Sequence, residues 1–236
     1  HKNDHVRAQS ARGLSRIKLT VAPKELIAAL EDSAADVRQH AAASLGQIKD
    51  RAAVLSLITA AEDKDFKVRY NAVNALVVLD DERAIPALVN ALGEKRLRIT
   101  ATTALERVGN AAVPALLEAL RTSDDDGLRI AVIEVFEDLD DPRTIDAMIE
   151  ALPHKRVRQF AAMSLGRIGK KALGPVTAAL KDSDPGRRIG AALALREMAD
   201  PTALPVMVEG LQDDEHHVRE YLAEGLGKMG AEAATA

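Results

Sequence analysis

The sequence predicts an all-α solenoid of about eight repeats of ~31 residues, from three observations. First, an arginine preceded by an aliphatic or similar residue recurs at intervals of 29 to 31 residues; the series is Arg7, Arg38, Arg69, Arg98, Arg129, Arg158, Arg188 and Arg219. Second, the residues seven places later are apolar: Leu14, Leu45, Leu76, Leu105, Phe136, Leu165, Leu195 and Leu226. Third, the chain is 47% hydrophobic but only 2% aromatic, and its apolar residues are mainly good helix formers. A period of this length indicates stacked supersecondary units.

Each repeat is predicted to hold two helices. The first has patterns such as AIPALVNAL (84–92), AVPALLEAL (112–120) and TIDAMIEAL (144–152). Asp-Pro pairs at 141–142 and 200–201 predict a cap followed by proline at the first helical position. The recurring prolines near these starts are Pro86, Pro114, Pro175 and Pro205. The second helix bears the arginine and is expected to end at glycine, as at Gly109, Gly169 and Gly230. About fifteen helices follow, because repeat 1 has only its second helix.

No linker or low-complexity segment interrupts the repeats, so a single domain is predicted over residues 1–236. The end units of a repeat array normally carry polar caps. Here the first repeat is incomplete and both end helices are of the ordinary repeat type. We therefore expect a fragment of a longer array.

The repeats resemble the HEAT-like family, and more closely its short PBS-lyase type. The second-helix pattern D…VR..A...LG.I, best matched from Asp32 to Ile48, carries this resemblance together with first helices such as AVPALLEAL. The resemblance implies a right-handed α-α superhelix (HEAT-like solenoid) whose second helices line a concave surface. The family includes assembly scaffolds, adaptors and cyanobacterial bilin lyase subunits.

The repeated arginines are predicted to be structural. Each lies at the edge of its helix's buried stripe, and in four repeats an aspartate precedes the arginine by six residues: Asp32, Asp63, Asp182 and Asp213. Because a guanidinium suits partly buried carboxylates, we expect a ladder of Asp–Arg pairs that ties each repeat to its neighbour.

Repeats 4 and 6 have shorter turns that lack this aspartate. Their sequences are GEKRLR (93–98) and PHKRVR (153–158), and the cations of a basic ridge would be Lys95, Arg96, Lys155, Arg156 and Arg187. This ridge makes polyanion or nucleic-acid binding one alternative function. Acidic residues along the same ridge and a net charge of −4 argue against it.

The face of the second helices opposite the buried stripe is the predicted binding surface. A helical wheel places the residues one, two, five and nine positions after each arginine on this face. Its apolar members are the predicted partner-binding residues: Tyr70, Ile99, Ile130, Phe160, Met163, Ile189, Leu193 and Tyr221. An apolar centre inside a polar rim is typical of an interaction surface.

Catalytic, metal and membrane signals are absent from the sequence. There is no cysteine, no phosphate-binding loop and no metal-ligand motif, and the adjacent His216 and His217 should point about 100° apart on a helix. No apolar run reaches the ~18 residues of a membrane span. We therefore expect a cytoplasmic protein that is not an enzyme, with no cofactor, no metal and no catalytic residues.

Besides polyanion binding, the sequence supports two further hypotheses about function. The leading one is a non-enzymatic scaffold that binds a protein or peptide segment on the concave face. The other, from the resemblance, is a bilin-lyase-type, chromophore-handling subunit. In that case Arg107 and Arg167, near Phe160 and Met163, would hold the anionic tetrapyrrole. The oligomeric state is left open.

Overall fold

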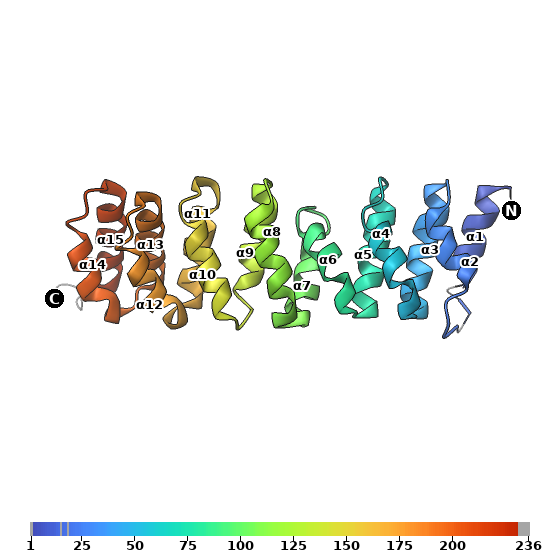
Figure 1. Cartoon of the computed structure of the whole chain (residues 1–236), viewed down its shortest axis with the longest axis horizontal. Helices are drawn as coiled ribbons and strands as arrows, with labels where there is room; N and C mark the ends of the chain where they lie inside the picture. The colour runs from blue at the N-terminus through green and yellow to red at the C-terminus, as the bar shows by residue number, and fades with distance from the viewer. Residues whose placement is uncertain (1, 15, 18, 231–236) are drawn as a thin grey trace. The chain divides into compact units, whose positions relative to one another are not determined.

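The computed structural model describes residues 2–14, 16–17 and 19–230, and these ranges contain fifteen α-helices, short 3₁₀ segments and no strand (Figure 1). The arginine-bearing second helices are α1 (Asp4–Leu14), α3 (Ala35–Ile48), α5 (Phe66–Leu79), α7 (Arg98–Val108), α9 (Asp126–Phe136), α11 (Lys155–Ile168), α13 (Pro185–Met198) and α15 (His216–Met229). The first helices are α2 (Lys24–Ala28), α4 (Val54–Ala60), α6 (Ile85–Leu92), α8 (Val113–Thr122), α10 (Pro142–Ala151), α12 (Lys170–Ala179) and α14 (Leu204–Gly210). The predicted all-α repeat architecture is confirmed. No helix within the described ranges has the length and apolar character of a membrane span.

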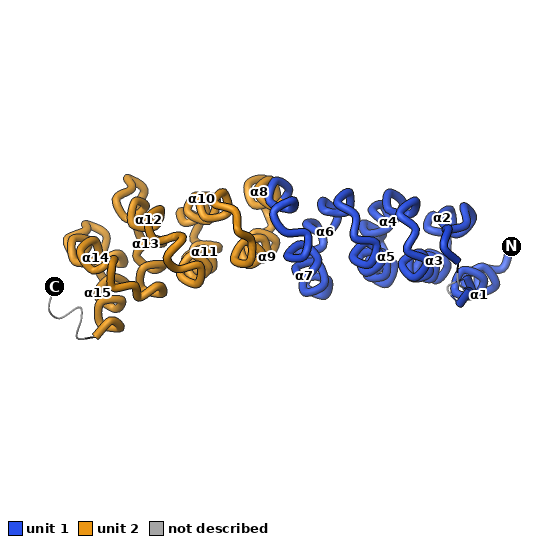
Figure 2. The backbone as a smooth tube through the Cα atoms, turned by 90° about the horizontal axis from the view of Figure 1, so that it is seen from below, with its two compact units in different colours: residues 1–115 blue, residues 116–236 orange. Residues whose placement is uncertain are grey.

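The chain forms two compact units, residues 1–115 and 116–236, and the division falls inside α8. Within each unit the first helices form one layer and the second helices another (Figure 2). The most extensive packing joins consecutive second helices: α1, α3 and α5 in the first unit, and α11, α13 and α15 in the second. The proposal of a single domain stays a prediction.

Residues seven places after the arginines form the centre of each unit. Six of the eight are buried: Leu45, Leu76, Leu105, Phe136, Leu165 and Leu195. Close helix approach also needs a small residue, because a Cβ on Gly46 would lie 2.9 Å from the Ala75 Cβ and 3.0 Å from its Cα. Helices α3 and α5 can therefore pack backbone to backbone.

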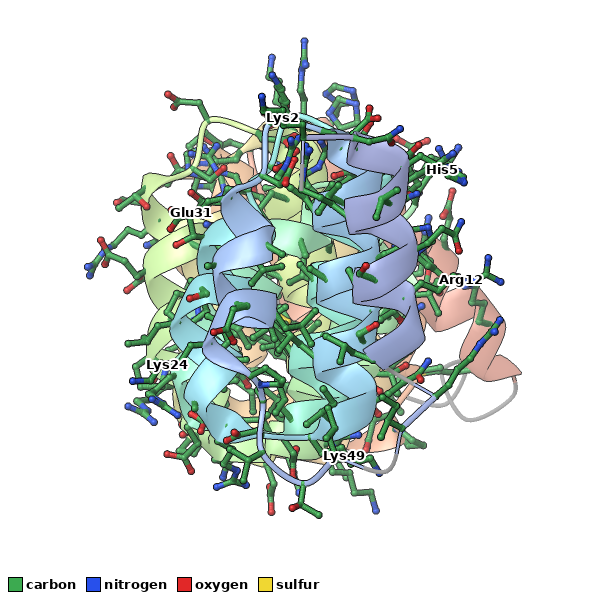
Figure 3. All side chains as sticks on the ribbon, turned by 90° about the vertical axis from the view of Figure 1, so that its right-hand side faces the viewer. Lys2, His5, Arg12, Lys24, Glu31 and Lys49 are labelled. Carbon is green, nitrogen blue, oxygen red and sulfur yellow. The ribbon has the colours of Figure 1, made fainter. Side chains whose placement is uncertain are left out.

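Charged side chains occupy the two outer faces of the layers. Figure 3 shows His5 and Arg12 of α1 pointing away from α2, while Lys24 and Glu31 of the first-helix layer point away from α1. Arg12 is five residues after Arg7, so this open face is the one that the helical wheel predicts.

Helix ends follow the predicted signals with two exceptions, one of which is that Asp200 and Pro201 begin a 3₁₀ segment while α14 starts at Leu204. The Asp141 carboxylate accepts a hydrogen bond from the Arg143 amide, and proline follows it at the start of α10. The predicted terminal glycines, 109, 169 and 230, have φ of +69°, +66° and +66°, which favours glycine. Pro175, however, lies inside α12 rather than near its start, because α12 begins directly after Gly169 without a 3₁₀ turn.

The arginine ladder is present. Three arginines bind an aspartate 25 residues further on through Nε: Arg7–Asp32 at 2.7 Å, Arg38–Asp63 at 2.7 Å and Arg188–Asp213 at 2.9 Å. Asp182 departs from the prediction and pairs with Arg187 of its own repeat at 2.7 Å. In the shortened turn of repeat 4, Glu94 replaces the aspartate and binds Arg69 at 2.8 Å.

Acid is expected to weaken the ladder. Hydrogen bonds from Arg7 lower the pKa of Asp32 from 3.8 to about 2, and Arg38 likewise lowers the pKa of Asp63. A lowered folded-state pKa contributes stability that is present above the unfolded value and is lost as pH falls toward the folded value. Urea unfolding followed by circular dichroism should therefore show stability falling between about pH 4 and pH 2.

An Asp32→Asn variant tests the assignment to this pair. It should be less stable than wild type at pH 6 and should lose less stability on acidification. If the variant loses as much stability as the wild type between pH 4 and pH 2, Asp32 does not contribute to the acid sensitivity.

Candidate binding groove

A groove of 600 Å³ lies along the open face of the second unit, over α11, α13 and α15. Its walls comprise Lys155, Arg158, Gln159 and Met163 from α11, Pro185, Gly186, Ile189, Leu193 and Arg196 from α13, and Glu215, His217 and Tyr221 from the third helix and its N-cap. The structure thus brings together four of the eight predicted partner-binding residues: Met163, Ile189, Leu193 and Tyr221. Its volume is in the range of about 300–1,000 Å³ typical of ligand pockets.

The helical period explains why these side chains share one face. Ile189 and Leu193 are four residues apart on α13, as are Gln159 and Met163 on α11, and residues at this spacing are neighbours on a helix surface. The two helices pack side by side. Met163 therefore extends the apolar row of Ile189 and Leu193 onto the neighbouring helix to form an apolar strip, with the polar Gln159 beside it.

Cationic side chains border this strip. The Arg158 guanidinium donates from Nε to the Leu152 carbonyl at 2.7 Å and from Nη2 to the Pro153 carbonyl at 3.0 Å. A Cβ on residue 186 would lie 2.6 Å from Arg158 Nη2, so a larger residue there would shift the guanidinium. Both acceptors are neutral carbonyl groups, and no carboxylate among the described residues forms an ion pair with this arginine.

A second arginine forms part of the aromatic end of the groove. The Arg196 guanidinium carbon lies 5.0 Å from the centroid of the Tyr221 ring, within cation–π range. Arg196 also pairs with Glu224 at 2.6 Å and with Glu197 at 2.8 Å. These contacts fix the guanidinium, whereas Lys155 at the other end of the groove is exposed.

The histidines of α15 lie closer together than the sequence predicted. The rings of His216 and His217 are 3.7 Å apart, and each Nδ1 lies 3.2 Å from Glu215 Oε1. A hydrogen bond from His217 lowers the pKa of the Glu215 carboxyl. The expectation that the two side chains point about 100° apart did not include the Glu215 carboxylate at the helix N-cap, toward which both rings turn.

The other predicted residues lie apart from this groove. Tyr70 and Ile99, 44% and 83% exposed, belong to the first unit, where the Tyr70 ring packs 5.9 Å from Phe66. In the second unit Ile130 of α9 is half-buried, and Phe160 of α11 is 37% exposed.

Leu193 is predicted to lie on the open face, but only 6% of it is exposed. The longer side chains of Met163 and Tyr221 line the groove on the neighbouring helices. Leu193 therefore forms the base of the groove rather than an exposed contact.

The two arginines expected to hold a tetrapyrrole have acidic partners already. Arg107 binds Asp80 at 2.9 Å and the Val77 carbonyl at 2.6 Å. Arg167 binds Glu137, with its Nε 2.6 Å from Oε2. The sequence analysis did not place Arg158 and Arg196 at the groove: it assigned Arg158 to the structural ladder, and Arg196 lies outside the four positions that it examined.

The basic ridge of the short turns is also partly engaged. The Arg96 guanidinium stacks 3.7 Å over the Phe66 ring, Arg156 is 3.2 Å from Asp126, and Arg187 binds Asp182. Polyanion binding remains an untested prediction.

Comparisons with known proteins support the repeat pattern. The sequence model described as HEAT repeats matches residues 22–106, 93–155 and 145–227. The bilin biosynthesis protein PecF of Nostoc sp. (strain PCC 7120 / SAG 25.82 / UTEX 2576) is 26% identical over 148 residues, which cover 55% of this chain and 86% of that protein.

Two solved structures align with most of this chain. Kap121p bound to Nup53p aligns with a TM-score of 0.61 at 13% identity, over 99% of this chain and 34% of that one, which supports the fold alone. The complex of CpcE and CpcF of phycocyanin lyase from Nostoc sp. PCC7120 aligns over 91% of this chain and 92% of that one, at 23% identity and a TM-score of 0.41.

These comparisons correct one expectation from the sequence. The absence of catalytic motifs led to the prediction that the chain is not an enzyme. The similarity to PecF contradicts that prediction, since bilin biosynthesis is enzymatic. The absence of a familiar catalytic residue set is therefore no evidence against an activity, because a fold can host many functions.

Proposed function

The chain belongs to the HEAT-repeat family, and we propose that it acts as a bilin-lyase-type, chromophore-handling subunit. The groove over α11, α13 and α15 would hold a linear tetrapyrrole. The observation that carries this proposal is the groove's combination of an apolar strip with cationic borders. The similarity to PecF supports it independently.

The two chemical features of a bilin correspond to the two features of the groove. A bilin has a long conjugated body and carboxylate side chains. Ile189, Met163 and Tyr221 offer apolar and aromatic contact to the body, while Lys155 and Arg158 offer charge-assisted hydrogen bonds to the carboxylates. The helices hold these groups before binding, so little ordering entropy is lost when the ligand enters.

Biliverdin titration tests the proposal. Wild-type protein is expected to shift the visible absorption band of biliverdin, with micromolar affinity. An Ile189→Glu variant should bind about tenfold more weakly or worse, because it places a carboxylate in the strip that receives the conjugated body.

Ile99→Glu is the matched control. Ile99 follows its repeat arginine by one residue, as Ile189 does, but it lies on α7 in the other unit and outside the groove. Equal weakening by both variants, or no band shift with the wild-type protein, contradicts the proposal. The second result favours the other candidate function, binding of a protein segment, for which the exposed Phe160 ring on α11 is the supporting observation.

A further inference from the structure

Among the described residues, Arg129 lacks the carboxylate 25 residues further on that four repeat arginines have; Arg98 and Arg158 lack it too, but their Nε atoms donate to backbone carbonyls. Arg7, Arg38, Arg69 and Arg188 each direct Nε to an acidic side chain 25 residues further on. For Arg129 the residue at that distance is His154. The Arg129 Nε is buried and has no hydrogen-bond partner among the described residues.

The short turn of repeat 6 explains this difference. Its sequence, PHKRVR, has the same length as GEKRLR of repeat 4, and His154 stands where Glu94 stands. Glu94 binds Arg69 with both carboxylate oxygens, at 2.9 Å and 2.8 Å. The same turn thus presents an acceptor for the arginine in repeat 4 and an imidazole in repeat 6.

A groove of 390 Å³ opens beside the Arg129 side chain, within the second unit. Leu117 and Leu120 of α8 and Ala147 of α10 form its apolar walls, and His154 also lines it. The Arg129 Nη1 lies 3.8 Å from Asp126 Oδ1 on its own helix, which is beyond hydrogen-bond distance. An unpaired buried donor of this kind is costly, so an external acceptor would gain affinity by satisfying it.

The charges around the groove define the ligand. Arg121 and Arg143 also line it, but each holds an acid of its own, Glu118 at 2.7 Å and Asp141 at 2.6 Å. Asp146 and Glu150 of α10 lie along the wall and would repel a multiply charged anion such as a phosphate ester. A singly charged carboxylate matches the planar guanidinium and meets less repulsion.

The geometry points to a carboxylate-binding site in the α8–α10 groove, where the Arg129 guanidinium receives the carboxylate and Leu117, Leu120 and Ala147 contact an attached apolar chain. The ligand is an amphiphilic carboxylate, either a free acid or an acidic side chain next to leucines in a protein segment. This site involves the first helices and is independent of the tetrapyrrole groove.

Sodium octanoate and the peptide acetyl-Leu-Leu-Glu-amide are the probes for the two sources. With leucine methyl groups ¹³C-labelled, binding of either probe should shift the signals of Leu117 and Leu120. Octan-1-ol should produce at least tenfold weaker effects at equal concentration, because it lacks the charge. Octanoate alone indicates a free acid, and tighter binding of the peptide indicates a protein segment.

His154→Glu provides the decisive variant. It recreates the turn of repeat 4, so the new carboxylate should bind Arg129, raise the melting temperature and weaken binding of either probe at least tenfold. His154→Gln is the control, because it removes the imidazole without adding a charge, and it should bind the probes more tightly than His154→Glu does. Arg129→Leu should also abolish binding.

Three results overturn the inference: failure of both probes to shift the methyl signals, equal binding of octan-1-ol, or undiminished binding by a folded His154→Glu variant. None of them bears on biliverdin binding, which the Ile189→Glu variant tests at the other groove.

Discussion

An Arg38→Met variant is expected to lose about 3 kcal/mol of unfolding free energy at pH 7. Arg38 is the most buried ladder arginine, with 7% of its side chain exposed, and it makes four hydrogen bonds. Two go to the Asp63 carboxylate at 2.7 and 2.9 Å, and two to the carbonyls of Asp32 and Ser33 at 2.8 and 3.2 Å. Methionine keeps the apolar stem but leaves the 13% exposed Asp63 carboxylate without its cation.

Urea unfolding followed by circular dichroism measures this loss. Because the cost comes mainly from the stranded charge, the double variant Arg38→Met, Asp63→Asn should be more stable than Arg38→Met alone. The asparagine oxygen can still accept the hydrogen bond that Asp63 takes from the Asp65 amide. Arg121→Met is the control for loss of an exposed pair, since the Arg121 side chain is 76% exposed, and it should change stability by less than about 0.5 kcal/mol. A loss for Arg38→Met as small as this would show that the ladder does not stabilise the array.

A Phe136→Ala variant is expected to lose about 3–5 kcal/mol. The Phe136 ring is fully buried in α9, at the position seven residues after Arg129 where the other repeats place leucine. Removing the ring forfeits its transfer free energy and leaves a cavity that the neighbouring helices fill only in part. The loss should appear in thermal and urea unfolding and should speed hydrogen exchange in α9 before it affects α15, because repeat arrays are stabilised by contacts between neighbours.

Phe160→Ala makes the comparison within the same unit. Phe160 lies two residues after its repeat arginine and is 37% exposed, so truncation should cost less than about 1 kcal/mol. Similar losses for both variants would mean that position relative to the arginine does not decide burial.

The sequence alone determined the architecture and the face of each helix on which a side chain lies. The positions of Phe136 and Phe160 relative to their arginines predicted that one is buried and the other open, and both are so. The glycines that end second helices and the Asp141–Pro142 start were likewise predictable. These features follow from the helical period and from backbone preferences, which act within a few residues.

Only the tertiary structure decided which side chains meet across repeats. Three examples depend on how each turn places a group roughly 25 to 30 residues away. They are the pairing of Arg69 with Glu94, the Arg129 Nε without a partner in the described part of the chain, and the neutralisation of Arg107 by Asp80. The groove that gathers Met163, Ile189 and Tyr221 depends on side-by-side packing of three helices. A periodic sequence specifies each helix almost identically, whereas small differences in turn length and packing determine which charges remain available to a ligand.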